Sequence, residues 1–269
     1  MYYIIQKNVF QDPRYDVIFG VMKELGLDYE CVEFKPNSNE FEIKTNRKDI
    51  FVYGSVKLAK LTADFDWFPG SFYGNNHEFE HYSKGYGINT INYGSYITHF
   101  SEKINWSDKT ELFIKPSIDA KVFTGKVFNE SEWNDFVYNS LNDPQNQRIN
   151  KITAIQISEP YSLIKEARIW IVGKKIVTSS YYRFHGGIEF EENVEESGLE
   201  FAQSMTELYN VADAYVMDIA LTYDGWKIME INCINSAGFY KGNVKKIIEA
   251  LESYYGNNAE GTMHNTVYN

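Results

Sequence analysis

The stretch YVMDIALTYDGWKIMEIN, residues 215–232, decides how this chain is expected to fold. Two apolar, alternating runs flank the Tyr-Asp-Gly sequence at 223–225, which predicts a β-hairpin. A three-residue loop with glycine in its left-handed third position would pair Thr222 with Trp226. Counted back from that pair, the two strands bring acidic side chains opposite each other.

This register places Asp218 opposite Glu230, and the two-residue period of a strand puts Asn232 on the same face. Directly opposed side chains have Cβ atoms roughly 4.5–5.5 Å apart. Because opposed like charges destabilise a sheet, a cation is expected between them. An all-oxygen cluster suits Mg²⁺ held together with substrate phosphates. A different loop register would instead turn Asp218 to solvent and leave Glu230 to pair with a lysine, and this segment alone leaves both interpretations open.

Length and composition bound the class of protein. With 269 residues and 43% hydrophobic residues, the chain has room for two or three lobes and a substantial core. It has no apolar run of about 18 residues and no signal-peptide pattern, so a cytoplasmic protein that spans no membrane is expected. Two cysteines, Cys31 and Cys233, provide neither a disulfide framework nor metal-ligand spacing. The net charge of −11 argues against broad duplex nucleic-acid binding, because that affinity comes from neutralising phosphates.

A second hairpin is expected around Gly173-Lys174, where a two-residue type II′ turn would pair Val172 with Lys175. One face of this hairpin would then carry an acid and two arginines. The residues on that face would be Glu166, Arg168, Trp170, Ser179, Tyr181 and Arg183. Planar, bidentate arginines suit phosphate or carboxylate groups. The alternatives are an exposed salt-bridge cluster worth little, and a three-residue loop that sends Arg183 to the opposite face.

Lysines upstream complete the pattern. Lys115 ends the apolar strand 111–115 just before a proline, where its ammonium could snorkel to solvent or meet a nucleotide phosphate. Lys121 and Lys126 follow in a loop that contains Gly125, and they could cover phosphates. The chain has no GxxxxGK[ST], GxGxxG, HExxH or GxSxG motif and no kinase signature, so the sequence does not indicate those classes.

The order of these parts resembles the ATP-grasp superfamily over about residues 105–255. The stretches that carry the resemblance are FIKPS at 113–117, EARIWIV at 166–172 and MDIALTYDGWKIMEIN at 217–232. With AKVFTGKVF at 120–128 and the later Arg183, they look like a subfamily of ATP-grasp domains common in phages and bacterial conflict systems.

The resemblance implies an α+β fold with an α/β N-terminal lobe, in which two α+β lobes clasp the nucleotide. The expected division is an N-terminal lobe at 1–104, a small ATP-grasp lobe at 105–158, a C-terminal lobe with the metal hairpin at 159–256 and a flexible tail at 257–269. Within the first lobe, residues 66–100 are expected to form long loops with short helices.

The resemblance also implies which residues bind ATP. Lys115 would contact the nucleotide and its phosphates, and the loop 119–126 would close over them. Residues near Gln156 to Glu159 would supply the adenine hinge, and Glu166 would hold the ribose hydroxyls. The full set implied to bind ATP is Lys115, Lys121, Lys126, Gln156, Glu159, Glu166, Arg168 and Arg183.

For the reaction, the resemblance implies an ATP- and Mg²⁺-dependent ligase. Such enzymes activate a carboxylate as an acyl phosphate for attack by an amine, which needs positioning and charge neutralisation and no enzyme nucleophile. Lys115, Arg168 and Arg183 would act catalytically, with the arginines on the γ-phosphate and the acyl phosphate. The residues implied to bind one or two Mg²⁺ ions are Asp218, Glu230 and Asn232.

The chain departs from the family pattern at one position and leaves the substrates open. Many of these ligases place an arginine two residues before the metal aspartate, where this chain has Val216, and Arg183 could compensate from a neighbouring strand. The carboxylate and amine are not specified, although a peptide or protein acceptor is consistent with the family and residues 235–238 are expected to touch it. The alternatives are a phosphotransferase on the same scaffold and a nucleotide-binding regulator without turnover.

Overall fold

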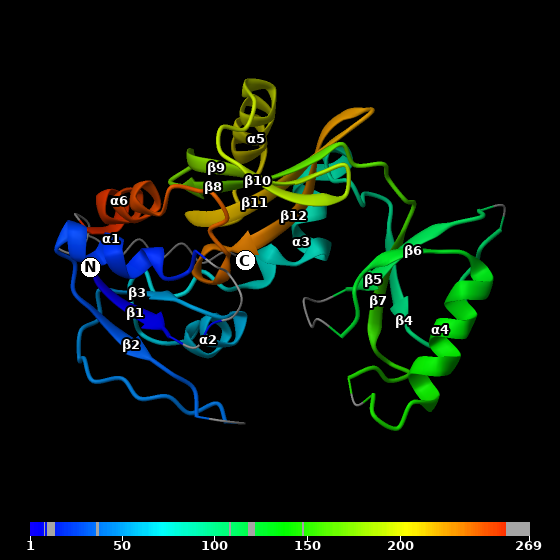
Figure 1. Cartoon of the computed structure of the whole chain (residues 1–269), viewed down its shortest axis with the longest axis horizontal. Coiled ribbons are helices and arrows are strands. Elements are labelled where there is room, and N and C mark those ends of the chain that lie inside the picture. The colour runs from blue at the N-terminus through cyan, green and yellow to red at the C-terminus, as the bar shows by residue number, and fades with distance from the viewer. Residues whose placement is uncertain are drawn as a thin grey trace. The chain divides into compact units, whose positions relative to one another are not determined.

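Two units of packed structure make up the chain, shown as a ribbon in Figure 1. The computed structural model describes residues 1–7, 9, 14–35, 38–107, 109–117, 122–146 and 148–256. Unit 1 consists of Met1–Tyr86 and Leu163–Asn269, and unit 2 consists of Gly87–Ser162. Unit 2 is therefore one continuous segment that interrupts unit 1 in the sequence.

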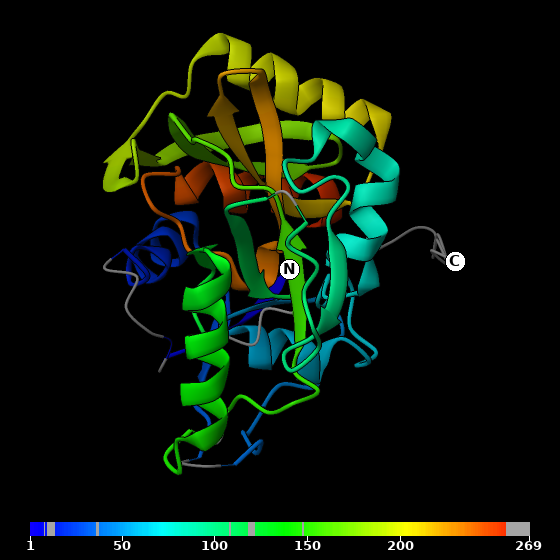
Figure 2. The same ribbon diagram turned by 90° about the vertical axis from the view of Figure 1, so that its right-hand side faces the viewer.

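The longest alternating segments of the sequence form a five-stranded antiparallel sheet in unit 1, in the order β10-β9-β8-β11-β12. Its strands are β8 (Lys165–Val172), β9 (Lys175–Phe184), β10 (Gly187–Glu191), β11 (Ala214–Thr222) and β12 (Gly225–Cys233). Helix α5 (Glu196–Leu208) covers one face of this sheet and α6 (Val244–Tyr255) packs on the other, as Figure 2 shows. Strands β8 and β11 are consequently buried almost throughout.

The N-terminal segment of unit 1 forms a parallel sheet in the order β2-β1-β3. Its elements are β1 (Tyr2–Gln6), α1 (Val17–Leu25), β2 (Tyr29–Val32), β3 (Ile50–Tyr53) and α2 (Val56–Thr62). Helix α1 ends at Gly26, which has the left-handed conformation (φ 65°) that the sequence predicts for a stop. A short helix, α3 (Phe79–Tyr86), completes this part of the unit and contacts β12.

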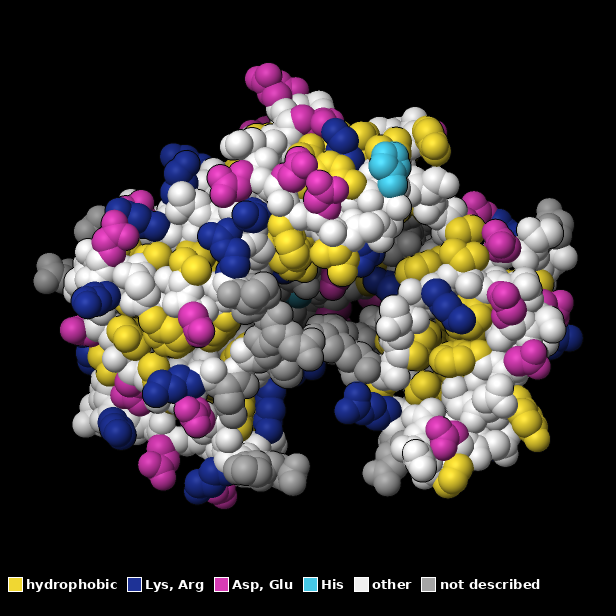
Figure 3. All heavy atoms as spheres, in the orientation of Figure 1, with side chains coloured by type: hydrophobic (Ala, Val, Ile, Leu, Met, Phe, Trp, Pro, Cys, Tyr) yellow, Lys and Arg dark blue, Asp and Glu magenta, His cyan; other side chains and the backbone are white. Residues whose placement is uncertain are grey.

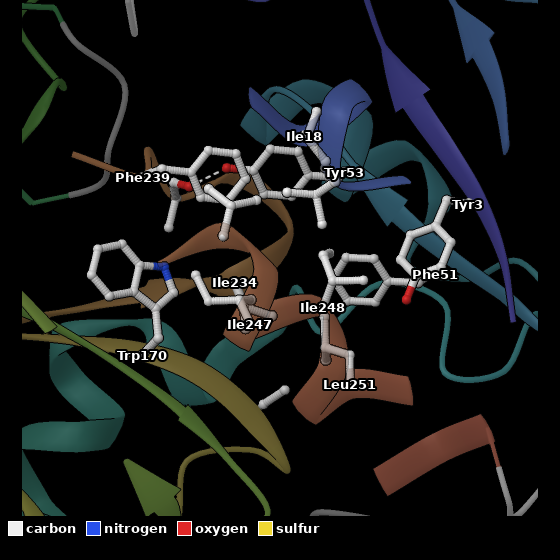
Figure 4. Close-up of a cluster of buried hydrophobic side chains, with 14 of the residues drawn as sticks. Tyr3, Ile18, Phe51, Tyr53, Trp170, Ile234, Phe239, Ile247, Ile248 and Leu251 are labelled. Carbon is white, nitrogen blue, oxygen red and sulfur yellow. Dashed lines mark hydrogen bonds between the residues drawn. The ribbon is translucent and has the colours of Figure 1, made fainter. Parts of the chain in front are cut away.

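One hydrophobic core joins the N-terminal sheet to the five-stranded sheet. In Figure 4, Phe51 and Tyr53 of β3 lie in the same cluster as Trp170 of β8 and Leu251 of α6. The last helix is also fixed at its far end, because the N-terminal ammonium and the Tyr3 hydroxyl both donate to the Glu252 carboxylate, at 3.0 and 2.7 Å. The two halves of unit 1 therefore complete each other although unit 2 separates them in the sequence.

Unit 2 is built on a four-stranded antiparallel sheet in the order β4-β7-β5-β6. Its strands are β4 (Tyr96–His99), β5 (Leu112–Pro116), β6 (Lys126–Phe128) and β7 (Ala154–Ser158). Helix α4 (Glu130–Asn142) begins at a capping box in which Asn129 and Glu132 satisfy each other's backbone amides. Its Trp133 packs on Phe128, with ring centroids 5.1 Å apart.

Three expectations about the organisation need correction or fall outside the structure. Residues 66–100 contain strand β4 in addition to short helices, and the expected loop before residue 129 contains β6. Because β4 pairs with β7, unit 2 begins at Gly87, whereas the small lobe was expected to begin at residue 105. The expected tail at 257–269 lies outside the described residues. Among the described helices, none has the length and apolar character needed to cross a membrane.

Candidate nucleotide and metal site

The β11–β12 hairpin places Asp218 opposite Glu230, as the sequence predicts, but through a different register. The turn has two residues and pairs Thr222 with Gly225, where a three-residue loop was predicted. The register shifts between the pairs of Asp218 and its neighbour, so Met229 is an extra residue in a β-bulge. The bulge offsets the shorter turn and returns the two carboxylates to one face.

The positive charge beside Asp218 comes from a side chain, Arg168. Strand β8 sets Arg168 directly opposite Asp218, and its Nε and Nη2 donate to the two carboxylate oxygens at 2.8 Å each. Asn232 donates a third hydrogen bond to Asp218, from Nδ2 to Oδ2 at 3.1 Å. Asp218 is only 2% exposed and Arg168 8%. Within the sheet, Asp218 is thus held by three donors in a buried, charge-compensated position.

Arg168 is itself fixed by the segment that follows β12. Its Nη1 donates to the carbonyl of Gly238 at 3.2 Å, and its guanidinium lies over the ring of Tyr240 at 4.6 Å. Burial alone would lower the pKa of Arg168, but the adjacent Asp218 carboxylate outweighs burial and raises it. The guanidinium therefore stays charged, and its donors are occupied within the fold.

Glu166 and Arg183 form a second acid–arginine pair on the same sheet. They lie opposite each other on β8 and β9, and Nη1 of Arg183 donates to Oε1 of Glu166 at 3.4 Å. Glu166 is 2% exposed, whereas the Arg183 side chain is 41% exposed. In the described part of the chain, the buried Nε of Arg183 has no hydrogen-bond partner. Arg183 thus keeps donors for a ligand, and Glu166 is the buried carboxylate beside it.

The register of β9 differs from the prediction along its length. The Gly173-Lys174 turn does pair Val172 with Lys175, as predicted. A register shift after the first pairs then places Ser180 opposite Arg168, and a second shift restores Arg183 to the face of Glu166. The two residues misplaced by the prediction are Ser179 and Tyr181, which lie opposite Ile169 and Ala167.

Three tyrosines near these charges were missed by the sequence analysis. Burial, Asp218 and Glu166 together raise the pKa of Tyr182 well above its usual value. Burial, Glu230 and Asp218 raise the pKa of Tyr82, which shows that helix α3 reaches the carboxylates. Tyr240 stacks on Tyr182 with ring centroids 5.1 Å apart. The sequence has no periodic signal for these positions, because each belongs to an element whose partners are distant in the chain.

Asn235, expected at the acceptor, is a structural residue. It is fully buried, and its Nδ2 donates to the carbonyls of Val52 at 2.7 Å and Gly70 at 3.1 Å. Its Oδ1 accepts the backbone N–H of Phe72 at 2.7 Å. The amide therefore ties the end of the metal-site hairpin to the N-terminal sheet, and it has no group left for a substrate. In the same segment, the Gly238 carbonyl is the group already bonded to Arg168.

Unit 2 brings together Lys115, Gln156 and Gly125. Lys115 on β5 and Gln156 on β7 are cross-strand partners. Gln156 is 1% exposed and donates from Nε2 to Ser95 at 2.8 Å, while its buried Oε1 has no partner among the described residues. The loop backbone at Gly125 lies so close to Lys115 that an added Cβ would be 2.6 Å from the Lys115 Cβ. This sheet edge thus presents a half-buried ammonium beside an unused amide oxygen.

The other candidates of unit 2 do not join this group. Glu159 is exposed and forms an ion pair with Lys109. Lys126 is exposed, and its Nζ lies over the ring of Phe128 at 4.5 Å. Lys121 lies outside the residues that the structure describes.

The residues around Asp218 fit a divalent cation that is shared with substrate oxygens. In the described ranges, no three His, Cys, Asp or Glu side chains gather into a group that could hold a metal. The set here is two carboxylates and one amide: Glu230 and Asn232 are half-buried, and Asn232 turns its Nδ2 to Asp218, which leaves Oδ1 as an acceptor. Mg²⁺ is usually bound by one or two carboxylates together with substrate phosphates and water. The incomplete set therefore suits Mg²⁺ better than a metal that needs a full cage of protein ligands.

Comparison with known families identifies the class of this protein. Residues 66–251 match a family described as an ATP-grasp domain, family 3 of its clade. The chain therefore belongs to this family of ATP-grasp domains, and its fold is the ATP-grasp fold that the sequence predicts. A search among curated proteins finds no significant match.

Solved structures with the same fold extend over nearly the whole chain. D-cycloserine synthetase DcsG is 8% identical, with a TM-score of 0.64 and coverage of 94% of this chain and 98% of that one. D-alanine–D-alanine ligase from Bacillus anthracis is 13% identical, with a TM-score of 0.57 and coverage of 95% and 93%. The ATP-grasp ligase PsnB, solved with minimal precursor, Mg and ADP, is 11% identical, with a TM-score of 0.55 and coverage of 94% and 96%. At these identities, the likeness concerns the fold.

Proposed function

We propose that this protein is an ATP- and Mg²⁺-dependent ligase that activates a carboxylate as an acyl phosphate for attack by an amine. The observation that carries the proposal is the buried Asp218, which Arg168 and Asn232 hold opposite Glu230 on a sheet of the ATP-grasp fold. Family membership supports the use of ATP, and two structural neighbours, D-alanine–D-alanine ligase and PsnB, are ligases by name.

In this proposal, the residues of the five-stranded sheet hold the metal and the transferred phosphate. The Mg²⁺ ligands are Asp218, Glu230 and Asn232, and Mg²⁺ supplies charge neutralisation to the phosphates when bound. Arg183, with its free Nε and exposed side chain, binds the γ-phosphate and steadies the acyl phosphate. Arg168 has its donors engaged by Asp218 and Gly238, so it acts by positioning Asp218.

The remaining residues bind the nucleotide. Lys115 neutralises phosphate charge, and the free Oε1 of Gln156 accepts a hydrogen bond from the base or from a bound water. Glu166 binds the ribose hydroxyls in exchange for part of its contact with Arg183. Lys121, Lys126 and Glu159 stay in the proposal as residues of the covering loop and the hinge.

We further infer that the protein works in the cytoplasm and accepts an amine on a peptide or protein. Both cysteines, Cys31 and Cys233, are free, as reduced thiols are in that compartment. The acceptor class is supported by PsnB, a ligase of the same fold that was solved with a precursor. Phage or conflict-system origin remains part of the proposal through the sequence resemblance alone.

The test begins with nucleotide binding by the full chain. Calorimetric titration with the non-hydrolysable analogue AMP-PNP should show saturable binding with Mg²⁺ and a large loss of affinity with EDTA. Glu230→Ala should lose the Mg²⁺ dependence, while the control Glu200→Ala, at an exposed position of α5, should behave as the wild type. Binding that is indifferent to EDTA in the wild type would disprove the metal assignment.

Reaction type is tested separately, with ATP, candidate carboxylates and hydroxylamine. A ligase should release ADP and yield a hydroxamate, because hydroxylamine traps the acyl phosphate in place of the amine. ADP release with stable phosphorylation of the acceptor would instead identify a phosphotransferase. If no ADP forms although AMP-PNP binds, the protein would be a nucleotide-binding regulator.

A further inference from the structure

A cavity of about 370 Å³ opens in unit 1 between α1, β9 and the start of α6. Four valines contribute apolar surface to it, and hydroxyl and amide groups of β9 and of the segments after β10 and before α6 supply polar surface. Its volume lies within the range of small-molecule sites, which is about 300–1,000 Å³. None of its lining residues belongs to the candidate nucleotide and metal site.

The charges on the cavity wall are unbalanced. Four cations line it, Arg14, Lys241, Lys245 and Lys246, against one acid, Glu192. The whole chain has the opposite balance, with 26 Lys and Arg against 37 Asp and Glu. Figure 3 shows Lys and Arg side chains gathered on this face, beside the segment that leads into α6. A cationic wall on an acidic protein concentrates positive potential at one place, and anions are drawn to it.

Two of these cations are available to a ligand. Lys245 is engaged by Glu24, with Nζ and Oε1 2.5 Å apart, and Arg14 donates to the carbonyl of Tyr240 at 2.9 Å. Lys241 and Lys246 are exposed, and neither contacts a carboxylate in the part of the chain that the structure describes. Desolvating an ammonium on the cavity wall therefore needs an anion from outside the fold.

The backbone adds to the positive wall. Asn243 caps α6 by accepting the N–H of Lys246 at 3.1 Å, and the first turn of this helix contains no acidic residue. The positive end of the helix dipole consequently points toward the cavity, with Lys245 and Lys246 in the same turn. The cavity and its side chains, and not the helix end alone, define the candidate site.

The cavity also adjoins the groups that hold Asp218. The backbone of Lys241 donates to Oγ of Ser180 at 3.0 Å, and Ser180 lies opposite Arg168 in the sheet. The preceding residue, Tyr240, covers the Arg168 guanidinium and accepts the bond from Arg14. A ligand in the cavity is thus separated from the catalytic pair by a single segment, residues 240–241.

We propose that this cavity binds an anionic group of the substrate, so that the ligase acts on a molecule that bears a carboxylate or phosphate besides the group it joins. Lys241 and Lys246 pair with that anion, Arg14 supports them, and the valines contact the carbon skeleton. The assignment to the substrate rests on the proposed function, whereas the binding of an anion rests on the cavity and its charges.

Equilibrium binding tests the proposal without turnover. Glutarate and inorganic phosphate are titrated into the full chain by calorimetry at low ionic strength, with the nucleotide site filled by Mg·AMP-PNP. The test variant is Lys241→Ala with Lys246→Ala. The matched control is Lys84→Ala with Lys151→Ala, which removes the same charge from exposed lysines outside the cavity. Melting temperatures of all proteins show that each is folded.

We expect one probe or both to bind the wild type and the control with one site, and to bind the test variant at least tenfold more weakly. Glutarate binding alone indicates a carboxylate-bearing substrate, and phosphate binding alone a phosphorylated one. Equal binding by the test variant and the control, or no saturable binding of either probe to the wild type, would overturn the proposal. If Mg·AMP-PNP fails to bind while the anion titration behaves as expected, the proposed function fails and the anion site stands.

Discussion

Replacing Asp218 with asparagine is expected to lower the free energy of unfolding by about 3–5 kcal/mol. The carboxylate is 2% exposed and receives two hydrogen bonds of 2.8 Å from Arg168, which is itself 8% exposed. Asparagine keeps one acceptor, so one charge-assisted hydrogen bond of about 1.5–3 kcal/mol is lost. The larger part of the cost arises because the guanidinium remains buried without its counter-charge.

Urea unfolding, followed by far-ultraviolet circular dichroism without nucleotide or metal, measures this loss. Adding Arg168→Met to Asp218→Asn should recover at least half of it, because no uncompensated charge remains in the sheet. The control is Glu40→Gln, which breaks the exposed Lys35–Glu40 pair and should cost less than about 1 kcal/mol. If Asp218→Asn costs no more than this control, or if the double variant is less stable than the single one, the description of a buried, charge-compensated pair is wrong.

Three further predictions concern the stability of unit 1 and the loop over Lys115. Burial lowers the pKa of His77 from 6.5 to about 4, so the unfolded state binds the proton first as the pH falls. Stability should therefore drop by about 2 kcal/mol between pH 7 and pH 5, and His77→Gln should remove this share of the pH dependence of the urea midpoint. Asn235→Ala should cost at least about 3 kcal/mol in the same assay, because it leaves two carbonyls and one N–H buried without partners. Gly125→Ala places a Cβ 2.6 Å from the Lys115 Cβ and should raise the KM for ATP by about tenfold or more in a steady-state assay, and an unchanged KM would show that this loop does not approach the nucleotide.

Local rules were enough to predict the parts of the site that neighbouring strands control. The two-residue period and the turn sequences predicted both hairpins, and with them the pairing of Asp218 with Glu230 and of Val172 with Lys175. The Asn129 cap of α4 followed from its residue type in the same way. Each of these features depends on residues that are close in the sequence, so tertiary packing had little to change.

The features that could not be predicted depend on distant contacts. The bulge at Met229 and the shifts along β9 depend on how each strand packs against both of its neighbours, and no residue type marks them. Arg168 pairs with Asp218 because β8 lies beside β11, and these strands are not joined by a turn. Asn235 reaches Val52 across 183 residues, so only the assembled unit reveals its role. Strand β4 has four residues, which is too short for a periodic signal.

The interruption of unit 1 by unit 2 has a consequence for how the protein is made. The core of the N-terminal sheet includes side chains of α6, and Tyr3 and the N-terminus bind Glu252. Roughly 170 residues separate the end of the first segment from that glutamate, which a ribosome needs about 10 to 30 s to translate at about 5–20 residues per second. Unit 2, which is continuous, can fold as it emerges, whereas the first 86 residues wait for the last helix with their apolar strands uncovered. During translation, the nascent chain is therefore most exposed to aggregation and to chaperone binding at its N-terminal end.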